Sequence, residues 1–353
     1  MDSQEAVRQG ILDHLESYGV HFNSETDQLV ADDIRLMQHE LAKQTNARGS
    51  QFKNKVIDSF ARPEEIDILK VSPYLVVVET TQQSRIWAYA SSFWSIPITN
   101  GYGRRIRFLV FDENNDKLIG IVGLADPIIG LGARDNFIGW HKEQKVKRLY
   151  NCMTAYMLGA VPPYNSILGA KLVALTLMFP EVRKIFYDKY KNTTPIISGE
   201  KKKPYLVYVD TLGAFGKSAI YTRLMNWNFI GYTKGQSHIH ITANGSWELI
   251  KQLVPKEQFK TYKYGQGPNW KMRVLKAGLK EVGLSEEMLS IGWQRGYYCC
   301  PLAENWQEYL LGESNRPVWK KYTKVDLVEY WRQRWISPRL DSLREKLAVL
   351  PLC

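Results

Sequence analysis

The sequence predicts an α/β protein in which helices flank a mixed β-sheet, and three features of the chain point to this class. Strand and helix patterns alternate through the middle of the chain, and parallel neighbours in a sheet need helical crossovers between them. Of the 353 residues 44% are hydrophobic and 12% aromatic, which is enough to bury a sizeable core. The net charge changes sign along the chain, because the first fifty residues are acidic and the rest are basic. We therefore predict an acidic helical unit over residues 1–60, an α/β core over 61–250 and a basic, mostly helical unit over 251–353.

The N-terminal unit is predicted from apolar residues at helical spacing. Val7, Ile11 and Leu15 place one helix within residues 4–17, and Leu29, Ile34, Met37 and Leu41 place a second within 27–43. The polar stretch 44–51 then interrupts the pattern. A small helical unit follows from this spacing.

The core is predicted from its succession of patterns. Residues 74–80 read as a strand, 82–94 as an amphipathic helix, and 105–126 as two strands joined by a polar turn at 113–116. The glycine-rich stretch 127–140 reads as a loop, and 151–161 as a strand. Helices follow within 168–190, divided at Pro180, because proline interrupts the helical hydrogen bonds. A strand at 205–210, a helix at 218–227 and strands at 229–235 and 238–242 complete the order.

The C-terminal unit is predicted to be mostly helical. Residues 269–284 and 302–312 have helical patterns, and 324–340 alternate aromatic with basic side chains. No internal repeat or low-complexity tract interrupts these segments.

The net charge of +11 is unevenly spread along the chain. Residues 1–50 carry four basic against nine acidic side chains, residues 51–250 carry 25 against 16, and residues 251–353 carry 18 against 11. A basic body of this kind attracts a polyanion, and nucleic acid, in particular DNA, is the commonest candidate. The alternative is a basic surface that serves solubility alone.

The composition also indicates where the protein works. No stretch approaches the roughly twenty apolar residues that span a bilayer, and the first ten residues lack the apolar core of a secretion signal. The four cysteines form no C-x-x-C pair and no disulfide framework. We expect a cytoplasmic protein with reduced thiols, no membrane partner and no metal.

The stretch VPPYNSILGAKLV, residues 161–173, predicts a strand end, a turn and the start of a helix. The first amides of a helix have no partner inside the helix, and their dipoles favour an anion. Asn165, Ser166, Gly169 and Lys171 are therefore candidates to hold a phosphate group of a cofactor. The alternative is that Asn165 or Ser166 merely caps the helix.

Three charged residues at the ends of strands and in the glycine-rich loop are candidates for catalysis. Arg134 and Asp135 stand in the loop, where a charged pair has no evident packing role, and Asp210 closes the strand at 205–210. A carboxylate at a strand end could act as a base or bind a metal, or could cap the following turn. His238 and His240 share a predicted strand face without a visible third ligand, so no metal site is assigned to them.

Basic side chains in two regions are candidates for binding nucleic acid. In the C-terminal unit aromatic rings that can stack on bases alternate with cations that can hold phosphates, although the tryptophans could instead pack a helical core. The candidates are Lys217, Arg223, Lys234, Lys271, Arg273, Arg332, Arg334 and Arg339.

Two family resemblances rest on these motifs. The element order, the turn at 161–173 and the segment YVDTLGAFGKSAIYTRLMNWNFIGYT resemble the acetyl-CoA-dependent N-acetyltransferase superfamily and its Mom-type DNA-modification members. LIGIVGLADPIIGLGARDNFIGW, LGAVPPYNSILGAKLVAL, YYCCPLAENWQEYLLG and YWRQRWISPR resemble the DruA family of the Druantia anti-phage defence systems. The second resemblance covers residues 60 to 340 approximately.

The resemblances imply bacterial antiviral immunity, other defence proteins as partners, and an acetyltransferase-like core. Tyr221 matches the position where related acetyltransferases place a tyrosine as general acid. Acetyl-CoA or another acyl-CoA is the implied cofactor; its identity stays open, because Leu168 stands where the superfamily has a small residue. Two functions remain: a protein that engages DNA through its basic surface, or an enzyme that transfers an acyl group to a nucleobase or a protein.

Overall fold

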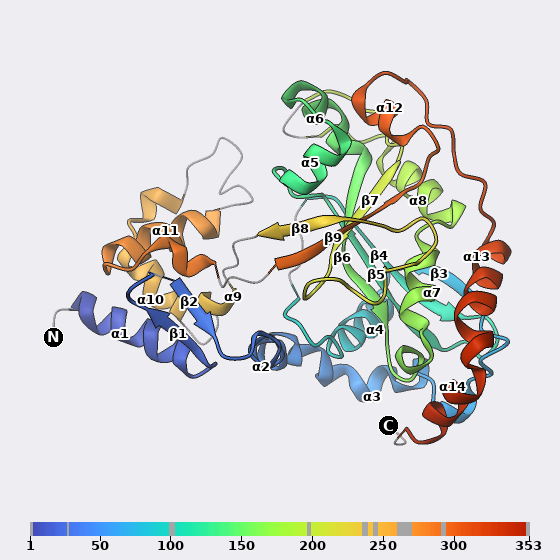
Figure 1. Cartoon of the computed structure of the whole chain (residues 1–353), viewed down its shortest axis with the longest axis horizontal. Coiled ribbons are helices and arrows are strands. Elements are labelled where there is room, and N and C mark those ends of the chain that lie inside the picture. Colours follow the sequence, from blue (N-terminus) through green and yellow to red (C-terminus); the bar gives the residue numbers. More distant parts are fainter. Residues whose placement is uncertain are drawn as a thin grey trace. The chain divides into compact units, whose positions relative to one another are not determined.

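The computed structural model describes residues 3–26, 28–98, 103–195, 199–234, 239–242, 246–259, 270–290 and 294–350 (Figure 1). The chain forms two compact units, each assembled from separate stretches. The smaller unit takes residues 1–47, 94–98 and 234–295, and the larger takes 48–93, 99–233 and 296–353. The predicted division at residues 60 and 250 into three consecutive units stays a prediction about how the chain folds.

The smaller unit joins both of its long stretches in one core. It contains the helices α1 (Ser3–Glu16), α2 (Ile34–Asn46), α9 (Ile239–Thr242), α10 (Ser246–Leu253) and α11 (Trp270–Glu281), and a hairpin of β1 (Val20–Asn23) and β2 (Gln28–Ala31). Leu15 and Leu41 pack in the same cluster as Ile250 and Leu279. Neither stretch can therefore bury its apolar face without the other.

The second predicted helix, 27–43, begins later than expected. Asp33 caps α2 and accepts hydrogen bonds from the amides of Arg35 and Leu36, at 2.8 and 3.1 Å. Gln28–Ala31 instead pairs in the hairpin. The helical spacing of Leu29 with Ile34 was therefore accidental.

The larger unit is a seven-stranded mixed sheet with helices on both faces (Figure 1). Its elements in order are α3 (Lys53–Val56), β3 (Pro73–Val77), α4 (Thr81–Ser91), β4 (Arg105–Asp112), β5 (Leu118–Ala125), α5 (Gly132–Ile138), α6 (Lys142–Arg148), β6 (Cys152–Ala160), α7 (Gly169–Thr176), α8 (Pro180–Tyr190), β7 (Tyr208–Leu212), β8 (Asn228–Lys234), β9 (Gln294–Pro301), α12 (Trp306–Leu311), α13 (Lys324–Trp331) and α14 (Leu340–Ala348). Short 3-10 turns connect several of them, and a π-helical turn covers Arg332–Ile336.

The strand order is β3-β4-β5-β6-β7-β9-β8. Antiparallel pairing runs from β3 to β6, β6 and β7 are parallel, and β7 is antiparallel to β9. The predicted mixed α/β sheet is confirmed. Its β9 strand comes from the region predicted to be mostly helical, and it lies between β7 and β8.

The parallel pair β6/β7 is short. Pairing covers Cys152–Thr154 against Tyr208–Asp210, while β6 continues to Ala160 and β7 to Leu212. The hydroxyl of Thr211 donates to the carbonyl of Ala155 at 2.7 Å where the ladder ends. The crossover between the two strands contains α7 and α8, divided at Pro180 as predicted, because proline suits the first position of a new helix.

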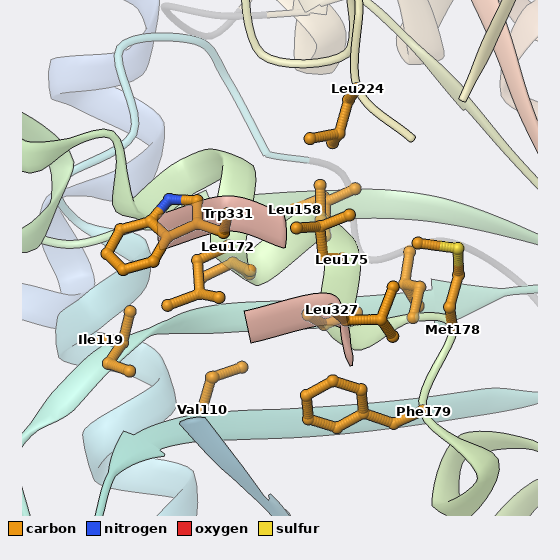
Figure 2. Packing of buried hydrophobic residues seen from close by; sticks show 14 of the residues in the cluster. Val110, Ile119, Leu158, Leu172, Leu175, Met178, Phe179, Leu224, Leu327 and Trp331 are labelled. Atoms are coloured by element: carbon orange, nitrogen blue, oxygen red, sulfur yellow. The ribbon is translucent and has the colours of Figure 1, made fainter. Parts of the chain in front are cut away.

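Helices α7 and α13 form the centre of the main core (Figure 2). Leu172 and Leu175 of α7 pack with Leu327 and Trp331 of α13, between these helices and the sheet. Each such side chain is fully buried, and burying one contributes about 1.5–3 kcal/mol. The aromatic C-terminal segment therefore contributes side chains to the core of the larger unit.

Three predicted elements are wrong. Residues 218–227 form turns instead of a helix, because Arg223 and Asn226 have φ values of 60° and 62°, which a right-handed helix excludes. Residues 239–242 form a helical turn instead of a strand, with the neighbours His240 and Ile241 both buried. The glycine-rich loop contains the helix α5, which ends at Gly139 with φ at 83°.

Among the residues that the structure describes, no helix is both long and apolar enough to traverse a bilayer.

Candidate functional site

A buried polar network lies where α5 packs on the sheet, and Arg134 is at its centre. The Arg134 side chain is fully buried, and its Nε and Nη2 atoms donate to the Asp135 carboxylate at 3.0 and 2.8 Å. Nη2 also donates to the carbonyl of Ile129 at 3.1 Å. Nη1 lies 4.0 Å from Oδ2 of Asp210 and has no hydrogen-bond partner among the described residues. The guanidinium thus bridges carboxylates from two distant segments.

Asp210 is the second carboxylate of this network. Its Oδ1 accepts a hydrogen bond from the Thr154 hydroxyl, and its Oδ2 accepts one from the Tyr297 hydroxyl at 3.1 Å. The Tyr297 hydroxyl in turn lies 2.9 Å from that of Tyr208. Burial raises the pKa of Asp210, against the opposing effects of the Arg134 charge and these two hydrogen bonds.

Asp135 carries the network toward the surface. Its Oδ2 accepts a hydrogen bond from Nζ of Lys145 at 2.7 Å, and the two side chains are 17% and 22% exposed. Burial raises the pKa of Asp135, but the hydrogen bond from Lys145 and the charge of Arg134 outweigh this effect, so that its pKa lies below the usual value. The cluster therefore has one end in the interior and one at the surface.

The fourth predicted catalytic residue, Tyr221, lies apart from this network. Its ring stacks on Trp227 with centroids 4.9 Å apart and contacts Tyr298, 5.1 Å away. Tyr298 pairs with Thr211 in the β7/β9 ladder, so it projects from the sheet face opposite to that of Asp210. The structure brings Arg134, Asp135 and Asp210 together but not Tyr221.

The turn before α7 differs from its prediction. The amide of Asn165 donates to the carbonyl of Val161 and that of Ser166 to the carbonyl of Pro163, both at 3.0 Å. The prediction that these residues present free amides is wrong, because Tyr164–Ile167 forms a 3-10 turn that uses them. Leu168, with φ at 61°, then redirects the chain into α7.

Gly169 and the carbonyl of Leu168 also have close contacts within the protein. A Cβ added to Gly169 would lie 2.6 Å from the carbonyl oxygen of Tyr164, so this glycine makes a close backbone approach. The carbonyl of Leu168 accepts a hydrogen bond from the Trp331 indole at 3.2 Å. The amides of Asn165 and Ser166 are therefore not available to a cofactor pyrophosphate, because each already has a partner within the protein.

Lys171 faces the interior instead of the turn. Its side chain is only 6% exposed, and Nζ donates to the carbonyls of Ala219 and Ile220 at 2.6 and 2.9 Å. It also lies 3.9 Å from the ring centroid of Trp335. Lys171 therefore ties α7 to the turns at 219–222 and to the C-terminal segment.

The predicted nucleic-acid residues occupy several environments. Arg223, Arg334 and Arg339 are exposed and have no carboxylate within ion-pair distance among the described residues, and the same holds for Lys217, which lies over the ring of Phe229. Arg332 instead pairs with Glu329 at 2.7 Å. In the smaller unit Lys271 lies near the rings of Trp247 and Trp270, and Arg273 lies on the same helix, α11. The side chain of Lys234 lies outside the described part of the chain.

Other polar residues near strand ends and in the smaller unit have structural partners. Asp126 accepts hydrogen bonds from the backbone amide and Nε of Arg104, both at 2.8 Å. His240 is buried, with Nε2 2.8 Å from the carbonyl of Met288. His238 lies outside the described residues.

Comparison with known proteins decides the family. The model of the family described as Druantia protein DruA matches residues 26–312. The chain belongs to the DruA family. A Druantia protein DruA from Escherichia coli (strain UMEA 4076-1) is 37% identical over 294 residues, which cover 81% of this chain and 73% of that protein. No solved structure matches this DruA-family chain.

Sequence reasoning did not find Thr154, Lys145 or Tyr297 as members of the network. The run YYCC at 297–300 is aromatic and strand-like, and it could have indicated β9. Its pairing with β7, and with it the contact of Tyr297 and Asp210, depends on tertiary structure.

Proposed function

We propose that this DruA-family protein acts in anti-phage defence by engaging nucleic acid, in particular DNA, through a basic surface of its larger unit. Membership of the family supports the defence role and the expectation of other defence proteins as partners. One observation supports the nucleic-acid role: Lys217, Arg223, Arg334 and Arg339 are exposed on the turns at 213–227 and on the segment 332–339, and none of them pairs with a described carboxylate. Tyr330 joins these segments, because its hydroxyl donates to the carbonyl of Arg223 and accepts from the amide of Met225.

Unpaired cations matter because ion pairs on the rest of the surface neutralise many of the others. Lys184 and Lys191 share Asp188, and Lys70 pairs with Asp67. An unpaired arginine offers its full charge and its planar fork of donors to a phosphate. The proposal therefore assigns the contacts to particular residues rather than to net charge.

Measurement of DNA affinity at several salt concentrations tests this function. Binding that releases condensed cations gives a logarithm of the binding constant that falls linearly with the logarithm of the salt concentration. Equal amounts of single-stranded DNA, duplex DNA and RNA identify the preferred form. A protein that binds none of them at low salt, or binds with no salt dependence, would rule the proposal out.

A second candidate function is group transfer, and the convergence of Arg134, Asp135 and Asp210 on one network favours it. Functional sites commonly contain charged groups with shifted pKa values, although structural ion pairs shift them too. The strand order and the parallel β6/β7 pair add support for an acetyltransferase-like core. The turn before α7 gives no support for an acyl-CoA cofactor.

The replacement Tyr297→Phe tests the second function. It keeps the ring and removes the hydroxyl that donates to Asp210, whereas Tyr190→Phe removes a comparable hydroxyl that donates to the carbonyl of Arg105. If the network is catalytic, Tyr297→Phe abolishes phage protection in plaque counts while DNA affinity and melting temperature match those of Tyr190→Phe. Full protection by both variants would remove the reason to assign chemistry to the network.

A further inference from the structure

One indole in the larger unit is surrounded by cations. Nζ of Lys171 lies 3.9 Å from the ring centroid of Trp335, and the guanidinium carbons of Arg334 and Arg339 lie 5.4 and 5.6 Å from it. Lys171 belongs to α7, whereas the arginines belong to the π-helical turn Arg332–Ile336 and the 3-10 turn Ser337–Arg339. The aromatic face attracts each cation, but the cations repel one another.

Within the part of the chain that the structure describes, no carboxylate forms an ion pair with these cations. Lys171 donates to backbone carbonyls, and Arg339 donates from Nη1 to the carbonyl of Trp335 at 3.3 Å. Arg334 has no ion pair with any described residue, whereas its neighbour Arg332 has Glu329. Carbonyl oxygens carry only partial charges, so the group keeps nearly all of its positive charge.

Arg223 belongs to the same group, because Nζ of Lys171 also donates to the carbonyl of Thr222, the preceding residue, at 3.5 Å. Burial and the charges of Arg339 and Arg223 together lower the pKa of Lys171 to about 8. The indole Nε1 of Trp335 is a donor in a residue only 9% exposed, and it has no hydrogen-bond partner among the described residues. The structure thus combines four uncompensated cations with one unused buried donor.

We propose that Lys171, Arg223, Arg334 and Arg339 form one oxyanion site around Trp335 and that its occupant is a phosphodiester group of nucleic acid. The identity of the occupant rests on the proposed function; the existence of the site does not. The exposed arginines contact the phosphate, because each guanidinium can donate two parallel hydrogen bonds to it. Lys171 contributes its charge from the interior, where water screens it less.

A phosphodiester suits this site better than a carboxylate. The arginines come from two surface segments that Tyr330 holds together, so one phosphodiester of a strand can lie against arginines of both segments. The Trp335 ring is too buried to stack on a base, so the contacts of the site are made with the phosphate backbone by the exposed arginines. An acidic protein segment is the competing occupant, and the experiment includes it.

The test compares two double variants that lose the same charge. Arg334→Gln with Arg339→Gln removes two cations of the site. Lys184→Gln with Lys191→Gln removes one lysine of α8 and the lysine that follows this helix, both of which pair with Asp188. Thermal melting first establishes that both variants fold. Affinity for a 20-nucleotide single-stranded DNA is then measured from low to moderate salt.

We expect the arginine variant to lower the magnitude of the salt slope by about 0.7, the value for one phosphate contact with a single strand, and the lysine variant to leave it unchanged. Equal slopes for the two variants would overturn the site while leaving the proposed function intact.

Melting experiments with inorganic phosphate test the proposed site independently of nucleic-acid binding. At fixed ionic strength phosphate should raise the melting temperature of the parent above its value in chloride, and should not do so for the arginine variant. If phosphate stabilises the parent but the parent binds no nucleic acid, the site is supported and the proposed function is refuted. Poly-glutamate that binds the parent more tightly than DNA of equal charge, and loses binding in the arginine variant, would overturn the phosphodiester as occupant.

Discussion

At the scale of single residues, buried charge has the strongest consequences. Arg134 is fully buried, and Asp135 is the carboxylate in direct hydrogen-bond contact with it. A charge left in the interior without its partner is costly, because protein replaces water poorly as a solvent for ions. Asp135 therefore has a structural role whether or not it takes part in chemistry.

The first prediction concerns this carboxylate. Asp135→Asn should lower the free energy of unfolding by about 3 kcal/mol, since Arg134 then keeps only the more distant Asp210. Chemical denaturation measures this change. Asp188→Asn is the control, because it removes an exposed carboxylate that also contacts two cations, and its unfolding curve should stay close to that of the parent. Identical curves for both variants would show that Arg134 does not need Asp135.

The second prediction concerns pH. The pKa of Lys171 is about 8 in the folded chain and roughly 10.4 in an unfolded one, so Lys171 loses its charge between pH 7 and 9 only while folded. A phosphodiester does not titrate there, and the surrounding arginines stay charged. The DNA affinity of the parent protein should therefore fall by roughly fivefold from pH 7 to pH 9. The affinity of the Lys171→Met variant should change little over the same range.

The contribution of Lys171 to the free energy of unfolding should rise with pH while the DNA affinity falls. Above pH 8 the unfolded chain binds more protons at Lys171 than the folded chain does, so this residue makes the free energy of unfolding rise with pH. Loss of affinity through unfolding would instead follow a fall in stability. Binding and denaturation curves at pH 7, 8 and 9 distinguish these causes.

At the scale of elements, the turn at 161–173 shows what sequence reasoning could and could not reach. Its strand, turn and helix were predicted correctly, because hydrophobic period and proline positions are local signals. Its hydrogen bonds were not, because the 3-10 turn pairs the amides of Asn165 and Ser166 with nearby carbonyls, and because the Trp331 indole that donates to the carbonyl of Leu168 comes from a distant segment. The helix predicted at 218–227 is wrong for a similar reason. Several of its apolar side chains are buried as the spacing predicts, but consecutive turns instead of a helix bring them into the core.

The third prediction belongs to this turn. Gly169→Ala should lower the melting temperature by several degrees, because the new Cβ would meet the carbonyl oxygen of Tyr164. Gly132→Ala is the matched control: it lies in α5, and nothing lies within 4 Å of the Cβ it would add. Equal melting temperatures for the two variants would contradict the close approach at Gly169.

At the scale of the whole molecule, the two units are discontinuous in sequence. Charge and composition divide the chain into consecutive parts, but core contacts join residues near Ile11 to residues near Leu279. No local pattern carries this information, since the pairing of distant segments is decided by which surfaces fit together. The sheet is a further case, because sequence predicted strands but not the insertion of β9.

The fourth prediction follows from the smaller unit. A fragment of residues 1–60 should show no cooperative thermal transition, because Leu15 and Leu41 lose the buried partners that α10 and α11 supply. Circular dichroism of the fragment and of the full chain measures this difference. A sharp transition in the fragment would instead support the division predicted from charge.

The position of β9 also has a consequence during synthesis. Strand β7 is complete when residue 212 has been made, but its neighbour in the sheet ends at residue 301. The ribosome must therefore add almost ninety further residues, a matter of roughly 4–20 s at bacterial and eukaryotic elongation rates, before β7 is paired on both sides. During that interval the nascent chain presents the hydrogen-bonding edge of an apolar strand, the kind of surface that molecular chaperones shield from neighbouring chains on a polysome.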